Sequence, residues 1–236
     1  MKAFLLAAGR GTRISKNIPD IPKCTLDVGG KPLILRTVEM LLENQVDVTV
    51  IVGYRDGCIR DVLKTLPVNI VYNPFFDVTN SIGSLWMARD YLSHEDTIIA
   101  NADVFWSRDL FEFLCHQNKD VFMLADKERV VDGDYFFYTQ DGVIKKYGKE
   151  LDIQNRTCEY VGIAWLNADF APLFKQRLME KVARQEHHCW WENVLYDMTQ
   201  ERDIYAVDVK GRFWAEIDFI EDYYRIIEYV KNNEKA

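Results

Sequence analysis

The sequence predicts an α/β fold: a three-layer sandwich whose central sheet is mixed but mostly parallel, with helices on both faces. In the first half of the chain, short apolar runs rich in β-branched residues alternate with stretches whose apolar residues recur at helical spacing. This alternation is typical of a sheet enclosed by two layers of helices. The chain has 236 residues, of which 48% are hydrophobic, and this is enough for one large domain with a substantial core.

The first half of the chain contains four expected strands. A buried strand at 3–8 leads into a loop rich in glycine and arginine, and residues 46–52 are expected to form a buried parallel strand because they are nearly all β-branched. Pro32 is well placed to start a helix that runs to about Asn44. The remaining elements expected here are a helix around 59–66, a strand at 68–72, a helix from 80 to about 92 and a strand at 97–100.

The pattern changes in the second half of the chain. Asp141-Gly142 stands between two strand-like runs, 135–139 and 143–147, and this dipeptide is a strong signal for a two-residue hairpin turn. No linker rich in Pro, Gly or Ser divides the chain, so we expect one domain, 1–236, in which about 131–236 closes over about 1–130. The other elements expected are a strand at 160–166, a helix to about 184, a short helix after 192, strands near 204–209 and 213–217, and a final helix from 219.

Composition excludes several classes of protein. The formal net charge of −8 argues against a surface that coats nucleic acid. The five cysteines form no CxxC pair, which favours reduced thiols over a disulfide framework or a zinc site. No apolar run approaches the roughly 20 residues that cross a bilayer, and arginines follow the short opening run where a signal peptide would be cleaved. We therefore expect a soluble cytoplasmic protein, monomeric or homodimeric, with neither nucleic acid nor membrane as a partner.

The opening loop carries the first signal for chemistry. Gly9 and Gly11 lack the Cβ that would keep backbone N–H groups away from a phosphate. Arg10, Arg13 and Lys23 can neutralise the charge of a polyphosphate. These residues predict a nucleoside triphosphate site, with a purely structural βα turn as the alternative. A dinucleotide site is disfavoured because isoleucine stands at position 14, where a third glycine is needed, and Gly53-Tyr54 stands where an acidic residue should close the second strand. The phosphate-binding motif GxxxxGK[ST] is also absent.

A longer motif extends this interpretation. Leu6-Ala-Ala-Gly-Arg-Gly-Thr-Arg13 and Pro22-Lys23 resemble the signature LAAGxGxRxxxxxxxxPKxL of the nucleotidyltransferase family that makes NDP-sugars and CDP-alcohols, with the leucine displaced to Leu26. The likeness continues through most of the chain and implies a Rossmann-like, GT-A-like fold. It implies that loop amides from Ala8 to Thr12 hold the triphosphate and the base edge. By the same resemblance, Arg13 contacts the β- and γ-phosphates and Lys23 bridges the reacting phosphates.

The resemblance thus gives a nucleotide site in the first part of the chain, about 1–130, and leaves the acceptor to about 131–236. Arg13 and Lys23 are the implied catalytic residues. The residues implied to bind the nucleotide are Leu6, Ala7, Ala8, Gly9, Arg10, Gly11, Thr12, Arg13, Lys23, Asn80, Ser81 and Ala102.

Two aspartates that follow strands are candidate metal ligands. Asp103 lies just beyond the strand at 97–100, and the carboxyl ends of strands face the crevice where α/β sheets bind ligands. Mg²⁺ prefers one or two carboxylates together with phosphate oxygens. Asp103 also resembles the family's D-x-D/N-like element, although Asn101 replaces the commoner first aspartate, and the resemblance makes Asp218 the second ligand. The alternative for both aspartates is a helix-capping role.

Three further stretches resemble the phosphocholine cytidylyltransferase branch of the family: Asn80-x-x-x-Ser84-Leu, Trp190-Trp-Glu-Asn193 and Glu216-Ile-Asp218. Aromatic faces beside a carboxylate bind an ammonium group well, although ordinary core packing is the alternative. Adjacent tryptophans face opposite ways, so we expect only one of the pair to line a pocket. The expected acceptor-binding residues are Trp106, Tyr135, Trp190, Trp191, Glu192 and Glu216, with Lys145 or Lys146 as a candidate for the acceptor's phosphate.

These expectations combine into one reaction. CMP would be transferred from CTP to a small phosphorylated or phosphonylated acceptor resembling phosphocholine, with Mg²⁺ as cofactor and pyrophosphate as the second product. A sugar-1-phosphate nucleotidyltransferase that makes an NDP-sugar would share the loop and the metal residues, and it is the nearest alternative. A non-catalytic nucleotide-binding module is an alternative of another class, but it would have no use for a pair of metal-binding aspartates.

Overall fold

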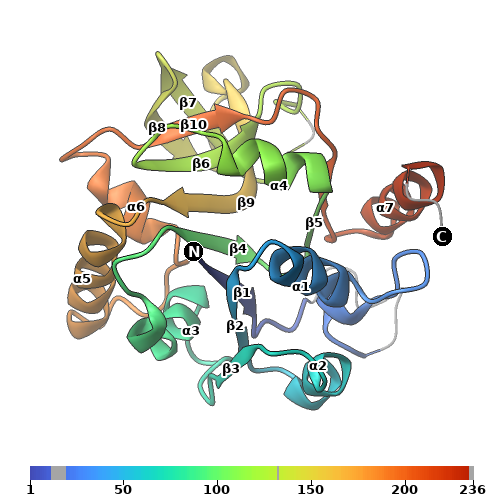
Figure 1. Ribbon diagram of the computed structural model, residues 1–236. Helices are drawn as coiled ribbons and strands as arrows, with labels where there is room; N and C mark the ends of the chain where they lie inside the picture. Colours follow the sequence, from blue (N-terminus) through green and yellow to red (C-terminus); the bar gives the residue numbers. More distant parts are fainter. Residues whose placement is uncertain (12–19, 132, 234–236) are drawn as a thin grey trace.

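The computed structural model describes residues 1–11, 20–131 and 133–233 (Figure 1). A nine-stranded mixed sheet runs through the molecule in the order β3-β2-β1-β4-β9-β6-β10-β8-β7. Its strands are β1 (Lys2–Ala7), β2 (Asp47–Val52), β3 (Asn69–Tyr72), β4 (Thr97–Asn101), β6 (Val121–Asp126), β7 (Phe136–Gln140), β8 (Val143–Gly148), β9 (Cys158–Leu166) and β10 (Tyr205–Asp208).

The sheet changes character at β9. The strands from β3 to β4 pair in parallel, with Leu5 opposite Val50 on one side and Ala100 on the other. β9 then runs antiparallel to both β4 and β6. The first four strands therefore end at one edge of the sheet, and the loops that follow β1 and β4 lie close together there. This is the edge at which doubly wound α/β sheets bind ligands.

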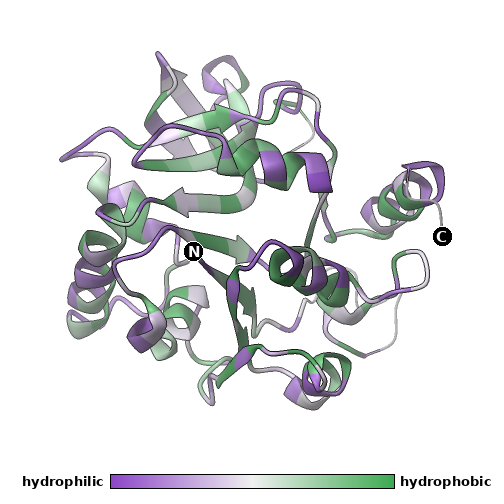
Figure 2. Cartoon of the chain, in the orientation of Figure 1, coloured by the Kyte–Doolittle hydropathy of each residue, from purple (hydrophilic) through white to green (hydrophobic). Residues whose placement is uncertain are grey.

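Helices cover both faces of the sheet, as expected for three layers. α1 (Leu33–Glu43), α2 (Asp56–Leu63) and α4 (Arg108–Cys115) pack their apolar residues on one face. α3 (Ser81–Met87), α5 (Phe170–Ala183) and α6 (Asn193–Met198) pack on the other. The colouring in Figure 2 follows this arrangement, with hydrophobic strands in the middle layer and hydrophilic residues on the outward sides of the helices. Burial of these apolar faces supplies most of the drive to fold.

A small second sheet positions the carboxylates of the site. β5 (Val104–Trp106) pairs antiparallel with β11 (Trp214–Glu216), so that Val104 lies opposite Glu216. The backbone N–H of Ile217 then donates to the Asp103 carbonyl at 3.0 Å. α7 (Ile220–Asn233) follows and packs Ile226 and Val230 into a separate apolar cluster with residues of the 26–33 segment. Two acidic stretches more than a hundred residues apart in sequence are thereby joined.

Most of the expected elements are present. The hairpin predicted at Asp141-Gly142 is formed by β7 and β8, and both turn residues have positive φ, 50° and 78°, as a type I′ turn requires. The elements that the expectations leave out include β6, a fully buried strand in the middle of the sheet. Its five apolar residues include only one β-branched residue, Val121, so the run alone does not distinguish a strand from a buried helix. Short 3₁₀ turns at Lys23–Thr25 (η2), Arg89–Tyr91 (η3) and Ile153–Asn155 (η4) complete the architecture. No helix in the described part of the chain is both long and apolar enough to cross a bilayer.

Candidate active site

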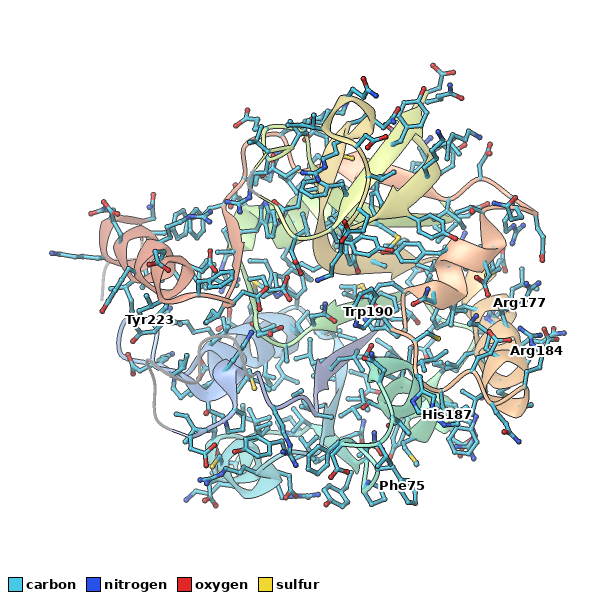
Figure 3. The ribbon with its side chains drawn as sticks, turned by 180° about the vertical axis from the view of Figure 1, so that it is seen from behind. Phe75, Arg177, Arg184, His187, Trp190 and Tyr223 are labelled. Carbon is cyan, nitrogen blue, oxygen red and sulfur yellow. The ribbon has the colours of Figure 1, made fainter. Side chains whose placement is uncertain are left out.

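A cavity of about 470 Å³ opens at the carboxyl ends of β1 and β4. It collects residues from the beginning, the middle and the end of the chain. Figure 3, which shows the molecule from behind relative to Figure 1, labels one of them, Trp190, near the middle of the view. The lining residues are Leu6, Ala7, Ala8, Gly9, Gly11, Pro22, Lys23, Cys24, Phe76, Thr79, Asn80, Ser81, Ser84, Asn101, Ala102, Asp103, Trp190, Glu192, Glu216 and Asp218. Most of the residues expected from the sequence therefore meet in one place.

The glycine loop forms one wall of the cavity. Gly11 has φ +61°, and a Cβ there would lie 2.6 Å from Lys23 Cγ. Only glycine fits at this position, because the loop turns in the left-handed region directly against the lysine side chain. Arg10 does not line the cavity; it points outward toward Asp77, at 3.7 Å, and toward the rings of Tyr54 and Phe76. Thr12 and Arg13 lie outside the described residues.

Lys23 stands at the centre of the charged part of the site. It belongs to η2 and is only 7% exposed. Its Nζ lies 2.6 Å from Asp218 Oδ1 and 3.5 Å from Asp103 Oδ2. Burial acts to lower the pKa of the Lys23 ammonium, but the neighbouring carboxylates outweigh it and leave that pKa above its usual value. Lys23 is therefore a fixed positive charge at neutral pH.

Three carboxylates gather around this lysine. Oxygen atoms of Asp103, Glu216 and Asp218 all lie within 4.8 Å of one another. Burial raises the pKa values of Asp103 and Glu216, and the charges of the neighbouring carboxylates raise them further. Three clustered carboxylates against one ammonium leave excess negative charge, and a hard divalent cation such as Mg²⁺ would balance it. The donor set therefore fits the metal expected from the sequence, with Glu216 as an additional candidate ligand.

The capping alternative for Asp218 does not account for its side chain. At the start of α7 the carboxylate of Asp222 accepts the backbone N–H groups of Phe219 and Asp218, at 2.9 Å and 3.3 Å. The Asp218 carboxylate is instead bonded to Lys23. Asp103 likewise lies before β5, whereas the residue that precedes α4 is Ser107.

The two adjacent tryptophans have different environments. Trp190 lines the cavity and is 41% exposed. Trp191 is fully buried against Phe174, and its Nε1 donates to Asn101 Oδ1 at 3.1 Å. Of this pair, only Trp190 reaches the cavity. The expectation that Trp191 contacts an acceptor is therefore wrong. Trp191 instead contacts Asn101, which lines the cavity.

Trp106 and Tyr135 also lie away from the cavity. Phe105 points toward α7, so strand alternation turns Trp106 to the opposite side, into the core beside Phe111 of α4. The placement of Trp106 in an acceptor pocket is therefore wrong. Tyr135 does not line the cavity itself; its ring lies edge-on against Trp190, with centroids 5.8 Å apart, and it supports that side chain from behind.

The lysines considered for the acceptor's phosphate are also elsewhere. Lys145 lies 3.7 Å from Asp203, which precedes β10, and Lys146 lies over the ring of Tyr138. Neither lines the cavity. Since β8 is exposed at both positions, the alternation that was expected to turn one lysine inward has no buried face to act on.

Asn101 is the residue whose role the sequence concealed. It sits at the end of β4, accepts the indole N–H of Trp191 and donates its amide to Glu192 Oε1 at 3.4 Å. Glu192 lines the cavity and is 6% exposed, and burial raises its pKa to about 7. The only sign of these contacts in the sequence was that Asn101 stands where the family more commonly has an aspartate. A neutral group that both donates and accepts explains that replacement.

Comparison with known proteins places this geometry in a family. Residues 3–188 match the MobA-like NTP transferase domain. The chain belongs to this family. It is therefore a nucleotidyltransferase, and the cavity that contains the glycine loop, Lys23 and the carboxylates is its candidate active site.

Individual relatives cover nearly the whole chain. The choline-phosphate cytidylyltransferase of Streptococcus pneumoniae is 25% identical over 235 residues, which span 98% of this chain and 99% of the relative. The 2-aminoethylphosphonate cytidylyltransferase of Lancefieldella rimae is 27% identical, over 92% of this chain and 88% of the relative. Among solved structures, the CTP:phosphocholine cytidylyltransferase LicC from S. pneumoniae superimposes with a TM-score of 0.76 at 22% identity, covering 97% of this chain and 98% of LicC. A structure at that identity shows the α/β nucleotidyltransferase fold.

Proposed function

We propose that the protein is a cytidylyltransferase that transfers CMP from CTP to a small acceptor carrying a phosphate or phosphonate and an ammonium group. The observation that carries the proposal is the presence of Glu192 and Trp190 in the same cavity as Lys23 and the three carboxylates. The buried Glu192 carboxylate is suited to an organic cation, and the Trp190 ring adds an apolar wall beside it. The hydroxyl groups of a sugar would call for a different lining. The relatives named for phosphocholine and for 2-aminoethylphosphonate support the same class of acceptor.

The reaction requires no protein nucleophile. A phosphoryl or phosphonyl oxygen of the acceptor attacks the α-phosphorus of CTP, a new P–O bond forms, and the bond from the α-phosphorus to the α–β bridging oxygen breaks. Pyrophosphate leaves with that electron pair, and the acceptor becomes linked to CMP. Catalysis then depends on holding the two anions in line and on neutralising the charge that develops between them.

The chain's own residues supply both functions. The backbone at Gly9 and Gly11 approaches the phosphates closely, and the backbone around Asn80 and Ser81 borders the same space. Lys23, held positive by its neighbours, stabilises charge on the α-phosphoryl oxygens. We assign Arg13, which lies outside the described residues, to the departing pyrophosphate. In this scheme the nucleotide is bound by about 1–130 and the acceptor chiefly by about 131–236, within one domain.

Asp103 and Asp218, with Glu216 beside them, would hold Mg²⁺. When bound, the ion supplies Lewis-acid charge neutralisation at the phosphates. An Asp218 carboxylate engaged with the ion would no longer pair fully with Lys23, and the ammonium would then be available to the reacting phosphate. Calorimetric titration of Mg²⁺ with the CTP-bound protein measures this independently of turnover, and Asp103→Asn should weaken the affinity by at least about tenfold.

A pyrophosphate-release screen tests the function. Four nucleoside triphosphates are crossed with phosphocholine, phosphoethanolamine, 2-aminoethylphosphonate and several sugar 1-phosphates. We expect release with CTP and an amine-bearing acceptor. Release confined to a sugar 1-phosphate would instead favour an enzyme that makes an NDP-sugar. One relative of that kind is the mannose-1-phosphate guanylyltransferase catalytic subunit beta of Drosophila melanogaster, which is 26% identical over 94% of this chain and 60% of the relative. Absence of release in every combination would favour a non-catalytic nucleotide-binding module.

A further inference from the structure

The amine end of the cavity is built for hydrogen bonding. Within the proposed function, on which this inference rests, the geometry points to a primary ammonium, R–NH₃⁺, as the group that the acceptor carries opposite its phosphate, in preference to a trimethylammonium. The two cations have the same charge, but only the first has N–H groups to donate. The discrimination therefore depends on whether the site offers aromatic faces or hydrogen-bond acceptors.

Aromatic faces are scarce at this end of the cavity. Among the described residues that line it, the aromatic side chains are Phe76 and Trp190. Phe76 packs beside Gly53 and Tyr54, next to the outward-pointing Arg10, and so belongs to the nucleotide end. Trp191, the other aromatic residue of the motif, is buried away from the cavity. A quaternary ammonium is held by several aromatic faces arranged around it, and one indole cannot supply them.

The remaining indole already has a cation beside it. Lys149 Nζ lies over the ring of Trp190, 5.4 Å from its centroid, and is anchored by Asp134 at 2.7 Å. The ring of Tyr135 contacts Trp190 edge-on. A second cation on Trp190 would compete with the lysine for the ring and would repel it. These contacts leave Trp190 as an apolar wall for the short chain between phosphate and amine.

Hydrogen-bond acceptors are available in contrast. Glu192 is buried at the cavity wall. Among the described residues, its carboxylate accepts a hydrogen bond from the Asn101 amide, and this bond is long, at 3.4 Å. Its raised pKa reflects a carboxylate that has lost water without gaining a compensating cation. A primary ammonium would supply both the charge and the missing donors. A trimethylammonium would supply the charge alone, from a greater distance.

Asn101 fixes where this carboxylate points. Its Oδ1 accepts from Trp191 Nε1 at 3.1 Å, which sets the amide so that the NH₂ group faces Glu192. Gly162 of β9 makes room for the amide, since a Cβ there would lie 3.4 Å from Asn101 Nδ2 and 2.8 Å from Val104 Cγ2. Asn101 is therefore a positioning residue that acts through Glu192.

The hydroxyl of Tyr160 on β9 is a second buried polar group. Tyr160 lies two residues from Gly162, and its hydroxyl has no hydrogen-bond partner within the described residues. Burial raises the pKa of this phenol, and the charges of Glu192 and Glu216 raise it further. An unsatisfied buried hydroxyl costs free energy, but Tyr160 does not line the cavity, so we do not assign it to the acceptor.

The test is a methylation series. Pyrophosphate release from CTP and Mg²⁺ is measured with phosphoethanolamine, its N-methyl and N,N-dimethyl derivatives, and phosphocholine. We expect kcat/KM to fall along the series, by at least about tenfold from first to last, because each methyl group removes a charge-assisted hydrogen bond. An equal kcat/KM for phosphocholine and phosphoethanolamine would overturn the inference but would leave the proposed cytidylyltransferase activity intact. Release with sugar 1-phosphates but with no member of the series overturns both.

A variant locates the discrimination in the structure. Glu192→Gln should reduce the difference in kcat/KM between the first and the last acceptor of the series. It should raise KM for phosphoethanolamine at least about tenfold and change KM for phosphocholine much less. Glu201→Gln, the same substitution at an exposed glutamate paired with Arg177, is the matched control and should leave the series steep. A series that stays steep in Glu192→Gln overturns the assignment to Glu192. If the variant does not fold, as judged by circular dichroism, the series on the unmodified protein decides alone.

Discussion

The two ends of the cavity are built in different ways. The nucleotide end is made largely from one continuous stretch, the loop after β1 and η2, and it presents backbone groups and one lysine. The acceptor end is made from single side chains of β4, the 190–192 segment and β11, which meet only in the folded chain. Backbone groups and a fixed charge serve any nucleotide phosphate, whereas placed side chains select one acceptor. The comparison suggests that catalysis and acceptor choice can be changed separately.

The largest effect is expected at the nucleotide end. Lys23→Ala removes the only described cation bonded to the carboxylate cluster and should lower kcat by about 100-fold or more with every acceptor. Steady-state pyrophosphate release measures this. Lys31→Ala, at an exposed lysine paired with Glu39, is the control and should retain activity. A loss confined to one acceptor would contradict the division between the two ends.

Gly11→Ala should have the next largest effect. The new Cβ would lie 2.6 Å from Lys23 Cγ at a φ of +61°, so the loop and the lysine must both shift. Strain of this kind costs on the order of 1–3 kcal/mol, and we expect kcat/KM for CTP to fall by about tenfold or more. Gly57→Ala is the control, since nothing lies within 4 Å of a Cβ there. Unchanged CTP kinetics in Gly11→Ala would show that the loop does not approach the phosphates.

Asn101→Asp should affect the acceptor alone. The substitution keeps an acceptor for the Trp191 indole N–H but replaces the donor to Glu192 with a carboxylate, which would repel Glu192. We expect KM for the acceptor to rise by about tenfold, with KM for CTP nearly unchanged, and the acceptor's pH profile to move upward. Asn118→Asp, at an exposed site, provides the comparison. Equal changes in both KM values would mean that Asn101 serves the nucleotide as well.

The smallest effect is on stability and depends on pH. The pKa of Glu192 is about 7 in the folded protein, above its ordinary value of 4.5. A carboxyl group with a raised pKa binds more protons when folded, so its contribution to stability is lost as pH rises from about 4.5 through about 7. Glu192→Gln should therefore gain stability relative to the unmodified protein between pH 5 and pH 8, by about 1–3 kcal/mol. Urea unfolding at the two pH values measures the difference, and no change with pH would contradict burial of an ionisable Glu192.

The same contrast explains what the sequence could predict. The glycine loop and Lys23 are local features, so their spacing alone indicated a phosphate site, and the family resemblance extended this to Asp103 and Asp218. The acceptor end depends on pairings that no local pattern records. Opposing Val104 to Glu216 brings a third carboxylate to the cluster, and strand alternation in β5 turns Trp106 into the core.

Adjacent residues at the acceptor end illustrate the limit most clearly. Sequence reasoning predicts that one of Trp190 and Trp191 lines the pocket, but which one depends on the hydrogen bond from Trp191 to Asn101. Lys145 and Lys146 were plausible partners for the acceptor's phosphate only if β8 had a buried face at those positions, and it has none. Side chains that act through contacts across the fold are therefore the part that required a structure.

Phosphorus NMR of one reaction mixture tests the central claim most directly. The mixture contains the protein, Mg²⁺, CTP and either phosphoethanolamine or 2-aminoethylphosphonate. The account predicts that the triphosphate resonances of CTP are replaced in equal amounts by those of pyrophosphate and of a new phosphoanhydride that joins the acceptor to CMP. Release of inorganic phosphate in place of pyrophosphate, or an unchanged acceptor resonance while CTP is consumed, would contradict it.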